Sequence, residues 1–361
     1  MFRAAGVVLS LSALALGLSS GDLHVSLKAI SPSVQSIDDI ILTAVVSNPT
    51  SGDIRVIAKN NVLDGSATNS FAVSKDDSSV LFTGVRTTLD LSEDSIYMTI
   101  PAGSSVAVNH TGLGPLYDFE TFGTGTFTFT PVAVFQTGAD AAPLQVKTDA
   151  VAVEVTHDVA KRSLVPLERR LSTPTCADGN RLQILKDSLA SARSLAGGAA
   201  TDILSHPNGP EYTTYFGGNT QSDIWFNMDR IAGDLASSGT RQIHCTGDPG
   251  QPMRRKQRCH CSYSYTLVVT SGGAIVGSDI YVCEYFFVNI PTTGGVCSND
   301  YILPQSSRGG VLLHELSHAT AGTADIAYGC TACASLSVGD KKNNADNYRC
   351  MGLDIFKDYN C

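Results

Sequence analysis

The ten cysteines of this 361-residue chain all lie between Cys176 and Cys361. An even number of cysteines gathered in one segment is typical of disulfide bonding in an oxidising compartment. Hydrophobic residues make up 43% of the chain and charged residues 16%, which is typical of folded rather than disordered protein. The length and this segregation predict two folding units, with the disulfides confined to the second.

The first twenty residues have the pattern of a secretory signal peptide. Arg3 gives a positive start, and an apolar run follows from Ala4 to Leu18 before several small residues. The run is shorter than the roughly 20 residues of a membrane span, which favours a signal peptide over a transmembrane helix. The alternative is a buried N-terminal helix. We predict a signal peptide at residues 1–20 and a soluble, secreted, extracellular product with no membrane partner. The net charge of −9 argues against nucleic acid as a partner.

The segment after the signal peptide is expected to be all-β and sandwich-like. Short runs of alternating apolar and polar residues recur between Gly, Asp, Asn and Pro, and this pattern is typical of a β-sandwich. The clearest runs cover residues 23–27, 54–58, 126–129 and 151–155. This segment contains no clustered motif for catalysis or metal binding, although Asn109 begins a glycosylation acceptor, Asn-His-Thr.

Two pairs of basic residues mark the expected boundary. Lys161-Arg162 and Arg169-Arg170 lie in a short polar stretch, where processing proteases of the kexin type cut secreted precursors. The alternative is that both pairs occur by chance on a linker. We predict a β-rich propeptide at residues 21–170, cleavage after Arg162 or Arg170, and a second domain at residues 171–361.

The second domain is expected to be mainly α, of the α+β class. Apolar residues recur at helical spacing in two stretches near its start, and two strand-like runs and two further helices follow. The helical positions are 182, 185, 189 and 192 and then 224, 228, 231 and 235, with Ser222 as a cap; the strands cover 265–270 and 274–282, and the later helices 311–320 and 345–357.

A His-Glu-Leu-Ser-His sequence lies on the apolar helix expected at 311–320. His314 and His318 are four residues apart, so they share one helical face and can reach one zinc ion. Glu315 lies beside that ion, where it can accept a proton from bound water. The alternative is a solvated helix with two incidental histidines, but a buried set of such polar groups needs partners.

The third ligand is expected downstream of His318. Ala321 and Ala324 stand where a metzincin needs glycine and histidine, and neither Glu nor His occurs after the motif. Four other aspartates and the cysteines are candidates, but Asp325 is the best, because Gly322 can end the helix and turn the chain back. Two imidazoles and one carboxylate leave a fourth position for water, as a catalytic zinc site requires.

His-Glu-x-x-His followed by Gly-Thr-x-Asp-x-x-Tyr-Gly resembles the deuterolysin, or aspzincin, family of fungal zinc metalloendopeptidases. The resemblance covers roughly residues 171–361 and includes Asn-Ala-Asp-Asn-Tyr at 344–348. It implies a zincin-type domain that binds one Zn²⁺ through His314, His318 and Asp325, with Glu315 as general base. Tyr328 matches a tyrosine that stabilises the oxyanion. Asp346 matches an acidic residue that supports the site, although an acid at a helix N-terminus is the alternative.

The resemblance also bears on a second tyrosine and on the cysteines. Where some relatives carry a further tyrosine, this chain has Phe286 or Phe287, which makes Tyr328 more important. The implied disulfides pair Cys176 with Cys245, Cys297 with Cys361, and Cys283 with Cys259 or Cys261. For the Cys330-Thr-Ala-Cys333 pair, disulfide bonding is expected rather than half a zinc site.

These features predict a secreted zinc endopeptidase that is made as a zymogen and acts as a monomer. Its expected partners are protein or peptide substrates. The β-rich segment has no cysteine, so it must hold the enzyme inactive by steric cover or through a ligand such as a carboxylate. The alternatives are a catalytically silent secreted binding protein that retains the peptidase fold, and a β-rich segment that stays attached as a binding module.

Overall fold

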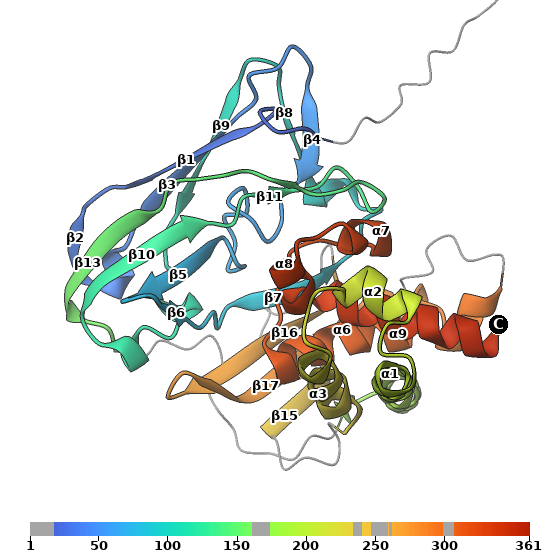
Figure 1. The fold of residues 1–361 in the computed structure, drawn as a ribbon. Helices are drawn as coiled ribbons and strands as arrows, with labels where there is room; N and C mark the ends of the chain where they lie inside the picture. Colours follow the sequence, from blue (N-terminus) through green and yellow to red (C-terminus); the bar gives the residue numbers. More distant parts are fainter. Residues whose placement is uncertain (1–17, 161–173, 234–239, 247–258, 260–261, 299–306) are drawn as a thin grey trace, which may run out of the picture.

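The computed structural model describes all residues except 1–17, 161–173, 234–239, 247–258, 260–261 and 299–306. The expected signal peptide, both basic pairs, Leu235 and Cys261 fall wholly or largely outside the described residues. In Figure 1 the strand-rich N-terminal part, residues 18–160, lies above and to the left of the helix-rich C-terminal part, residues 174–361. No helix in the described ranges is long and apolar enough to cross a lipid bilayer.

The described N-terminal part is built of strands and short 3-10 helices, as the alternating runs predict. Its strands form a three-stranded sheet, a five-stranded sheet and two strand pairs. In sheet order these are β1 (His24–Ala29), β3 (Leu42–Ser47) and β9 (Ser105–His110); β2 (Ser33–Ser36), β13 (Val151–Asp158), β10 (Gly125–Pro131), β5 (Phe71–Lys75) and β6 (Ser78–Val80); β4 (Ile54–Ile57) with β8 (Tyr97–Ile100); and β11 (Val134–Phe135) with β12 (Leu144–Gln145). The 3-10 helices are η1 (Ile37–Asp39), η2 (Asp94–Ile96), η3 (Gly114–Leu116) and η4 (Glu120–Phe122).

Alternation explains how this part folds. The residues of β3 are alternately buried and half-buried, so one face of the strand packs inward. The inward side chains of both larger sheets form one apolar core, with Phe71, Phe119, Phe127 and Phe129 at its centre and edge-to-face contacts between the rings. This core is separate from that of the C-terminal part.

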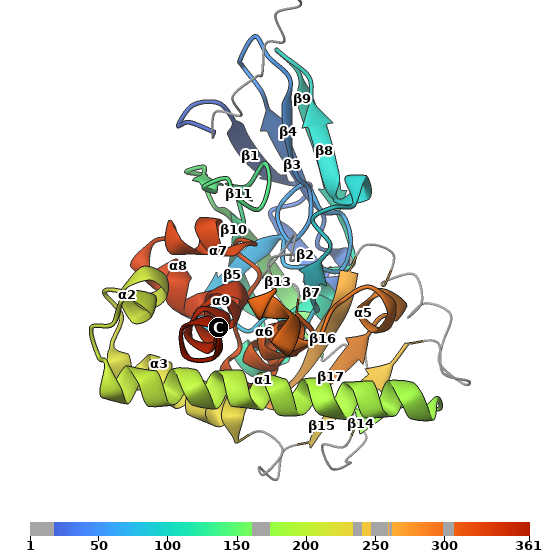
Figure 2. The same ribbon diagram turned by 90° about the vertical axis from the view of Figure 1, so that its right-hand side faces the viewer.

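The C-terminal part combines helices with one five-stranded sheet, an α+β arrangement that agrees with the expected class. The helices are α1 (Gly179–Ser205), α2 (Pro210–Phe216), α3 (Gln221–Ala232), α5 (Glu284–Val288), η6 (Thr293–Cys297), α6 (Arg308–Ala321), α7 (Cys330–Ala334), α8 (Val338–Asn343) and α9 (Ala345–Asn360). Thr220, rather than Ser222, is the N-cap residue of α3. Figure 2 shows the long helix α1 running beneath α6 and α9, which it packs against.

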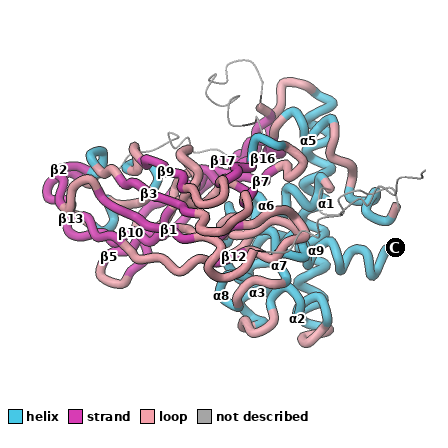
Figure 3. Tube along the Cα trace, turned by 90° about the horizontal axis from the view of Figure 1, so that it is seen from above, coloured by secondary structure: helices cyan, strands magenta, loops and turns pink. Residues whose placement is uncertain are grey.

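The sheet of the C-terminal part contains one strand from the N-terminal part. Its order is β14 (Pro174–Thr175), β15 (Thr240–Cys245), β17 (Ala274–Val282), β16 (Ser262–Ser271) and β7 (Val85–Leu89). Strand β7 pairs antiparallel with β16, and Figure 3 shows it beside β16 and α6. The sequence does not predict this pairing, because the segregated cysteines and the change of pattern near residue 171 indicate two separate folding units.

Among the described residues, four disulfides join segments of the C-terminal part. The pairs Cys176–Cys245 and Cys297–Cys361 confirm the implied connectivity, and Cys283 pairs with Cys259. Cys330 pairs with Cys350, which agrees with disulfide bonding at that position. Cys333 is a buried free thiol, so the expectation that it also forms a disulfide is wrong.

Candidate active site

Helix α6 positions the two histidines and the glutamate. It begins after Ser307, whose hydroxyl accepts a hydrogen bond from the Gly310 amide at 3.0 Å. It ends at Gly322, which adopts the left-handed conformation with a φ of 70°, as the sequence predicts. Every residue from 309 to 320 is buried, so the polar side chains on this helix need partners inside the protein.

Each imidazole has its Nδ1 atom occupied. His318 Nδ1 donates to the carbonyl oxygen of Thr323 at 2.8 Å, and His314 Nδ1 lies 2.6 Å from Oδ1 of Asp346. Because a carbonyl oxygen only accepts, the proton of His318 sits on Nδ1 and its Nε2 lone pair is free. The two Nε2 atoms lie 3.0 Å apart and face the same point.

Asp325 completes this group from the loop behind α6. Its Oδ1 atom lies 2.9 Å from Nε2 of His314 and 3.2 Å from Nε2 of His318. Ligand atoms around a tetrahedral zinc lie about 3.3 Å apart, given bonds of about 2.0–2.1 Å. Oδ1 of Asp325 is buried and has no hydrogen-bond donor in the described part of the chain. The three side chains predicted as ligands therefore converge, and their donor set fits one cation.

Electrostatics favour positive charge at this point. Burial alone works to raise the pKa of Asp325, but the neighbouring His318 and His314 outweigh it and hold that pKa well below its ordinary value. Burial works to lower the pKa of His314, whereas the adjacent carboxylates of Asp325 and Asp346 raise it to about 9. The cluster thus attracts positive charge strongly, as a cation site must.

Asp346 holds both the first histidine and the loop that follows the ligands. Besides the bond to His314, its Oδ2 atom accepts from the Gly329 amide at 2.9 Å and from Nη2 of Arg349 at 2.5 Å. Asp346 is fully buried in the first turn of α9. It therefore contacts a proposed metal ligand directly and also has the helix-terminal position that was the alternative.

Asn344 fixes the loop between Asp325 and Tyr328. Its Oδ1 atom accepts from the amides of Ile326 and Ala327 at 2.9 and 3.2 Å, and its amide nitrogen donates to the carbonyl of Ala327 at 3.0 Å. Asn344 and Asp346 both belong to the 344–348 stretch that carried part of the resemblance.

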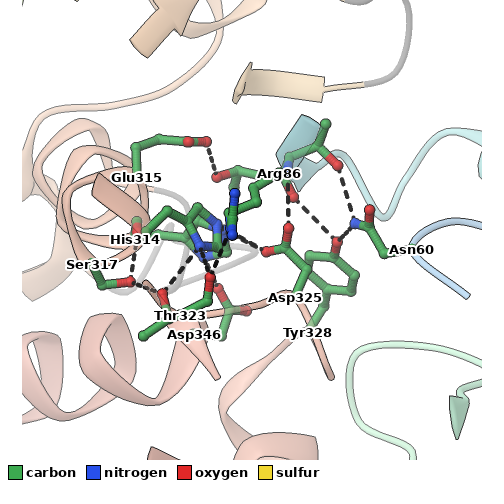
Figure 4. A network of polar contacts seen from close by, with 12 residues as sticks. Asn60, Arg86, His314, Glu315, Ser317, Thr323, Asp325, Tyr328 and Asp346 are labelled. Carbon is green, nitrogen blue, oxygen red and sulfur yellow. Dashed lines mark hydrogen bonds and ion pairs between the residues drawn. The ribbon is translucent and has the colours of Figure 1, made fainter. Parts of the chain in front are cut away.

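Tyr328 lies on the other side of Asp325 from the histidines (Figure 4). Its hydroxyl is buried, and it donates to the carbonyl oxygen of Thr87 at 3.1 Å and accepts from the side-chain amide of Asn60. Burial raises the pKa of Tyr328 well above its ordinary value, so the hydroxyl keeps its proton and remains a donor. Phe286 and Phe287 are buried in the core of the C-terminal part and offer no hydroxyl.

Glu315 is held by three hydroxyl groups. Ser264 of β16 and Thr88 of β7 each donate to Oε1 at 2.7 Å, and Thr266 of β16 donates to Oε2. Sequence reasoning missed these three hydroxyls together with Asn60 and Thr87. All lie in strands or loops far from the motif, and no local sequence signal distinguishes them from other Ser, Thr and Asn residues.

Comparisons with known proteins show which proteins this chain resembles. Residues 204–351 match the aspzincin family, described as Lysine-specific metallo-endopeptidase. The peptidyl-Lys metalloendopeptidase of Armillaria mellea is 28% identical over 359 residues, which cover 94% of this chain and 93% of the relative. Penicillolysin of Penicillium citrinum is 24% identical over 354 residues, which cover 93% of this chain and 94% of the relative. A solved zinc peptidase from Grifola frondosa is 21% identical with a TM-score of 0.34, covering 49% of this chain and 97% of its own.

The family match spans helix α6, the loop to Tyr328 and the first turns of α9, which together hold the convergent histidines and aspartate. The resemblance found in the sequence is confirmed: residues 204–351 match the aspzincin family, and the relatives, similar along most of the chain, indicate a zinc metalloendopeptidase.

Proposed function

We propose that this protein is a secreted zinc endopeptidase made as a zymogen, with one Zn²⁺ bound by His314, His318 and Asp325. The observation that carries the proposal is the convergence of three buried ligand atoms, with the Nδ1 proton of His318 turned away from the shared point. A bound zinc ion supplies Lewis acidity, which polarises a peptide carbonyl and lowers the pKa of water.

The protein side chains then divide the remaining work. Glu315 accepts the proton of the attacking water and delivers it to the leaving amine. Tyr328 donates a hydrogen bond to the oxygen that gains charge in the transition state. His314 and His318 keep their orientation through Asp346 and the Thr323 carbonyl.

Replacement of the general base tests the catalytic part of this proposal. Glu315→Gln keeps the size of the side chain and can still accept from hydroxyls, but an amide cannot take up a proton near neutral pH. We expect the variant to bind zinc as the wild type does and to lose nearly all hydrolysis of denatured protein. Full activity of a purified, zinc-loaded variant would exclude this role for Glu315.

The zymogen proposal rests on the sequence and on the contacts of the N-terminal part. We propose that the signal peptide at 1–20 directs secretion, that a kexin-like protease cuts after Arg162 or Arg170, and that the released enzyme is a monomer. Activity of the purified chain is compared before and after cleavage, and the medium is assayed for the product. Equal activity of both forms would refute inhibition by residues 21–170.

A catalytically silent binding protein is not favoured. The general base, the ligand set and the tyrosine are all present in one site, and the named relatives are peptidases. Activity that a chelator abolishes and zinc restores separates the two functions, because a silent protein shows none under either condition.

A further inference from the structure

Strand β7 lies along the edge of the sheet that faces the active-site helix. It pairs antiparallel with residues 262–267 of β16, so that Thr88 is opposite Ser264 and Thr87 is opposite Tyr265. An edge strand normally exposes part of its surface to solvent. All five residues of β7 are buried, because α6 covers one face and the loop carrying Tyr328 covers the other.

The peptide bond between Thr87 and Thr88 lies among the catalytic groups. The carbonyl oxygen of Thr87 accepts from the Tyr328 hydroxyl at 3.1 Å, and the amide of Thr87 donates to Oδ2 of Asp325 at 2.9 Å. The hydroxyl of Thr88 donates to Oε1 of Glu315 at 2.7 Å. The Thr87 carbonyl thus accepts a hydrogen bond from the proposed oxyanion donor. The Thr88 hydroxyl donates to the proposed general base, as an attacking water would.

Further contacts hold β7 in this position. Arg86 is buried, and its Nε donates to the Thr323 carbonyl at 3.1 Å, while its charge interacts with Asp325 and Glu315. Figure 4 shows Arg86 beside Asp325 and Asn60 beside Tyr328. Gln136 binds the backbone of Tyr328 twice, through its amide nitrogen at 2.6 Å and its carbonyl oxygen at 3.0 Å.

We propose that residues 85–89 are a built-in pseudosubstrate, in which the Thr87–Thr88 peptide bond occupies the position of the bond that the enzyme cleaves. This inference rests on the proposed function. It also names the interaction surface for substrates: once β7 leaves, residues 262–267 of β16 pair with an extended segment of a protein substrate in the same antiparallel direction. Such a surface fits loops and unfolded segments, because pairing needs free backbone N–H and C=O groups.

The pseudosubstrate resists hydrolysis because Thr88 takes the place of the attacking water. Glu315 and Thr88 are both 0% exposed, so bulk solvent does not reach the general base, and its Oε1 atom accepts from the Thr88 hydroxyl instead. Departure of β7 removes one of the two donors to Oε1 of Glu315 and leaves Ser264 as the other. A water molecule then has an acceptor in the place that Thr88 filled.

A synthetic peptide with the sequence of residues 83–91 tests the proposal. The enzyme is prepared by processing of the secreted full-length chain, and a fluorescent form of the peptide is titrated onto it and followed by anisotropy. We expect competitive inhibition of casein hydrolysis, and any slow hydrolysis of the peptide should fall between the residues equivalent to Thr87 and Thr88. A peptide carrying Thr87→Pro lacks the N–H that meets Asp325, and it should bind about tenfold or more weakly.

Protection of backbone amides provides a measurement independent of activity. The amides of β16 that face β7, and not those that face β17, should exchange slowly in the uncleaved chain, rapidly after processing, and slowly again with the native peptide. In the uncleaved chain Thr88→Val should increase this exchange, whereas Thr126→Val on the exposed face of β10 should not.

The outcomes separate the two proposals. One outcome refutes the pseudosubstrate and leaves the peptidase function intact. In that outcome the processed enzyme hydrolyses casein, but it binds the native, scrambled and Thr87→Pro peptides with equal affinity. Cleavage of the peptide at another bond refutes the register. A processed enzyme that binds the peptide but hydrolyses nothing refutes the proposed function alone.

Discussion

Asp346→Asn should weaken zinc binding by about 100-fold. The carboxylate accepts three donors, from His314, Gly329 and Arg349, at 2.6, 2.9 and 2.5 Å. An asparagine can present only one oxygen, so its NH₂ group must face at least one of these donors. Loss of a group that orients a metal-bound histidine typically costs 10–100-fold in affinity. The oxygen satisfies two donors, Gly329 and Arg349, only when the NH₂ group faces His314. Because that orientation removes the partner of the metal-binding histidine, we expect the upper end, about 2.7 kcal/mol.

Competition with a chromogenic zinc chelator measures this affinity directly on the purified enzyme. Thermal unfolding of the metal-free protein is measured alongside, because Asp346 also lies in the first turn of α9. Asp229→Asn on the exposed face of α3 is the matched control and should leave zinc affinity unchanged. If Asp346→Asn lowers only the unfolding temperature and binds zinc like the wild type, Asp346 acts solely as a helix-terminal acid and the positioning role is wrong.

Two further changes test separate parts of the site. Tyr328→Phe removes the proposed oxyanion donor without altering packing, and it should lower kcat by about 10²–10³-fold with little change in KM; a variant with wild-type kcat would exclude that role. Removing the Cys330–Cys350 disulfide, which closes 20 residues around Asp346, should lower the free energy of unfolding by about 3 kcal/mol in a denaturant titration of the processed enzyme. An unchanged midpoint would show that the bridge does not constrain the unfolded chain.

The sequence predicted that His314, His318 and Asp325 converge, because the determinants of their placement are local. His314 and His318 share a helical face by spacing, and Gly322 ends the helix so that Asp325 returns to the same point. The alternation of apolar residues likewise predicted β10, β13, β16 and β17, because each buries one face or lies at the centre of a sheet. Residues that act within one or two turns of a motif are therefore readable from the chain alone.

The contacts of β7 were not predictable in this way. Val85–Leu89 reads as an ordinary short strand, and nothing in its sequence shows that it joins a sheet of the other part. The choice of partner depends on shape and on the unpaired edge of β16, which only the assembled fold presents. Cys333 shows the same dependence on the assembled fold. An even number of cysteines predicts disulfide bonding, but it does not predict that Cys333 is a free thiol.

Ser264 and Thr266 remain beside Glu315 after β7 departs, so their hydroxyls should orient the general base in the active enzyme. They donate to different oxygens of the carboxylate, which fixes the plane of the group. Thr266→Val preserves shape and removes one donor to a charged acceptor, a bond worth about 1.5–3 kcal/mol. If that bond serves only to orient Glu315, kcat should fall by roughly 10- to 100-fold while KM and zinc affinity hold. Ser271→Ala, at the exposed end of β16, is the control. A Thr266→Val enzyme with wild-type kcat and an unchanged pH profile would mean that Ser264 alone, or the packing of α6, sets the position of Glu315.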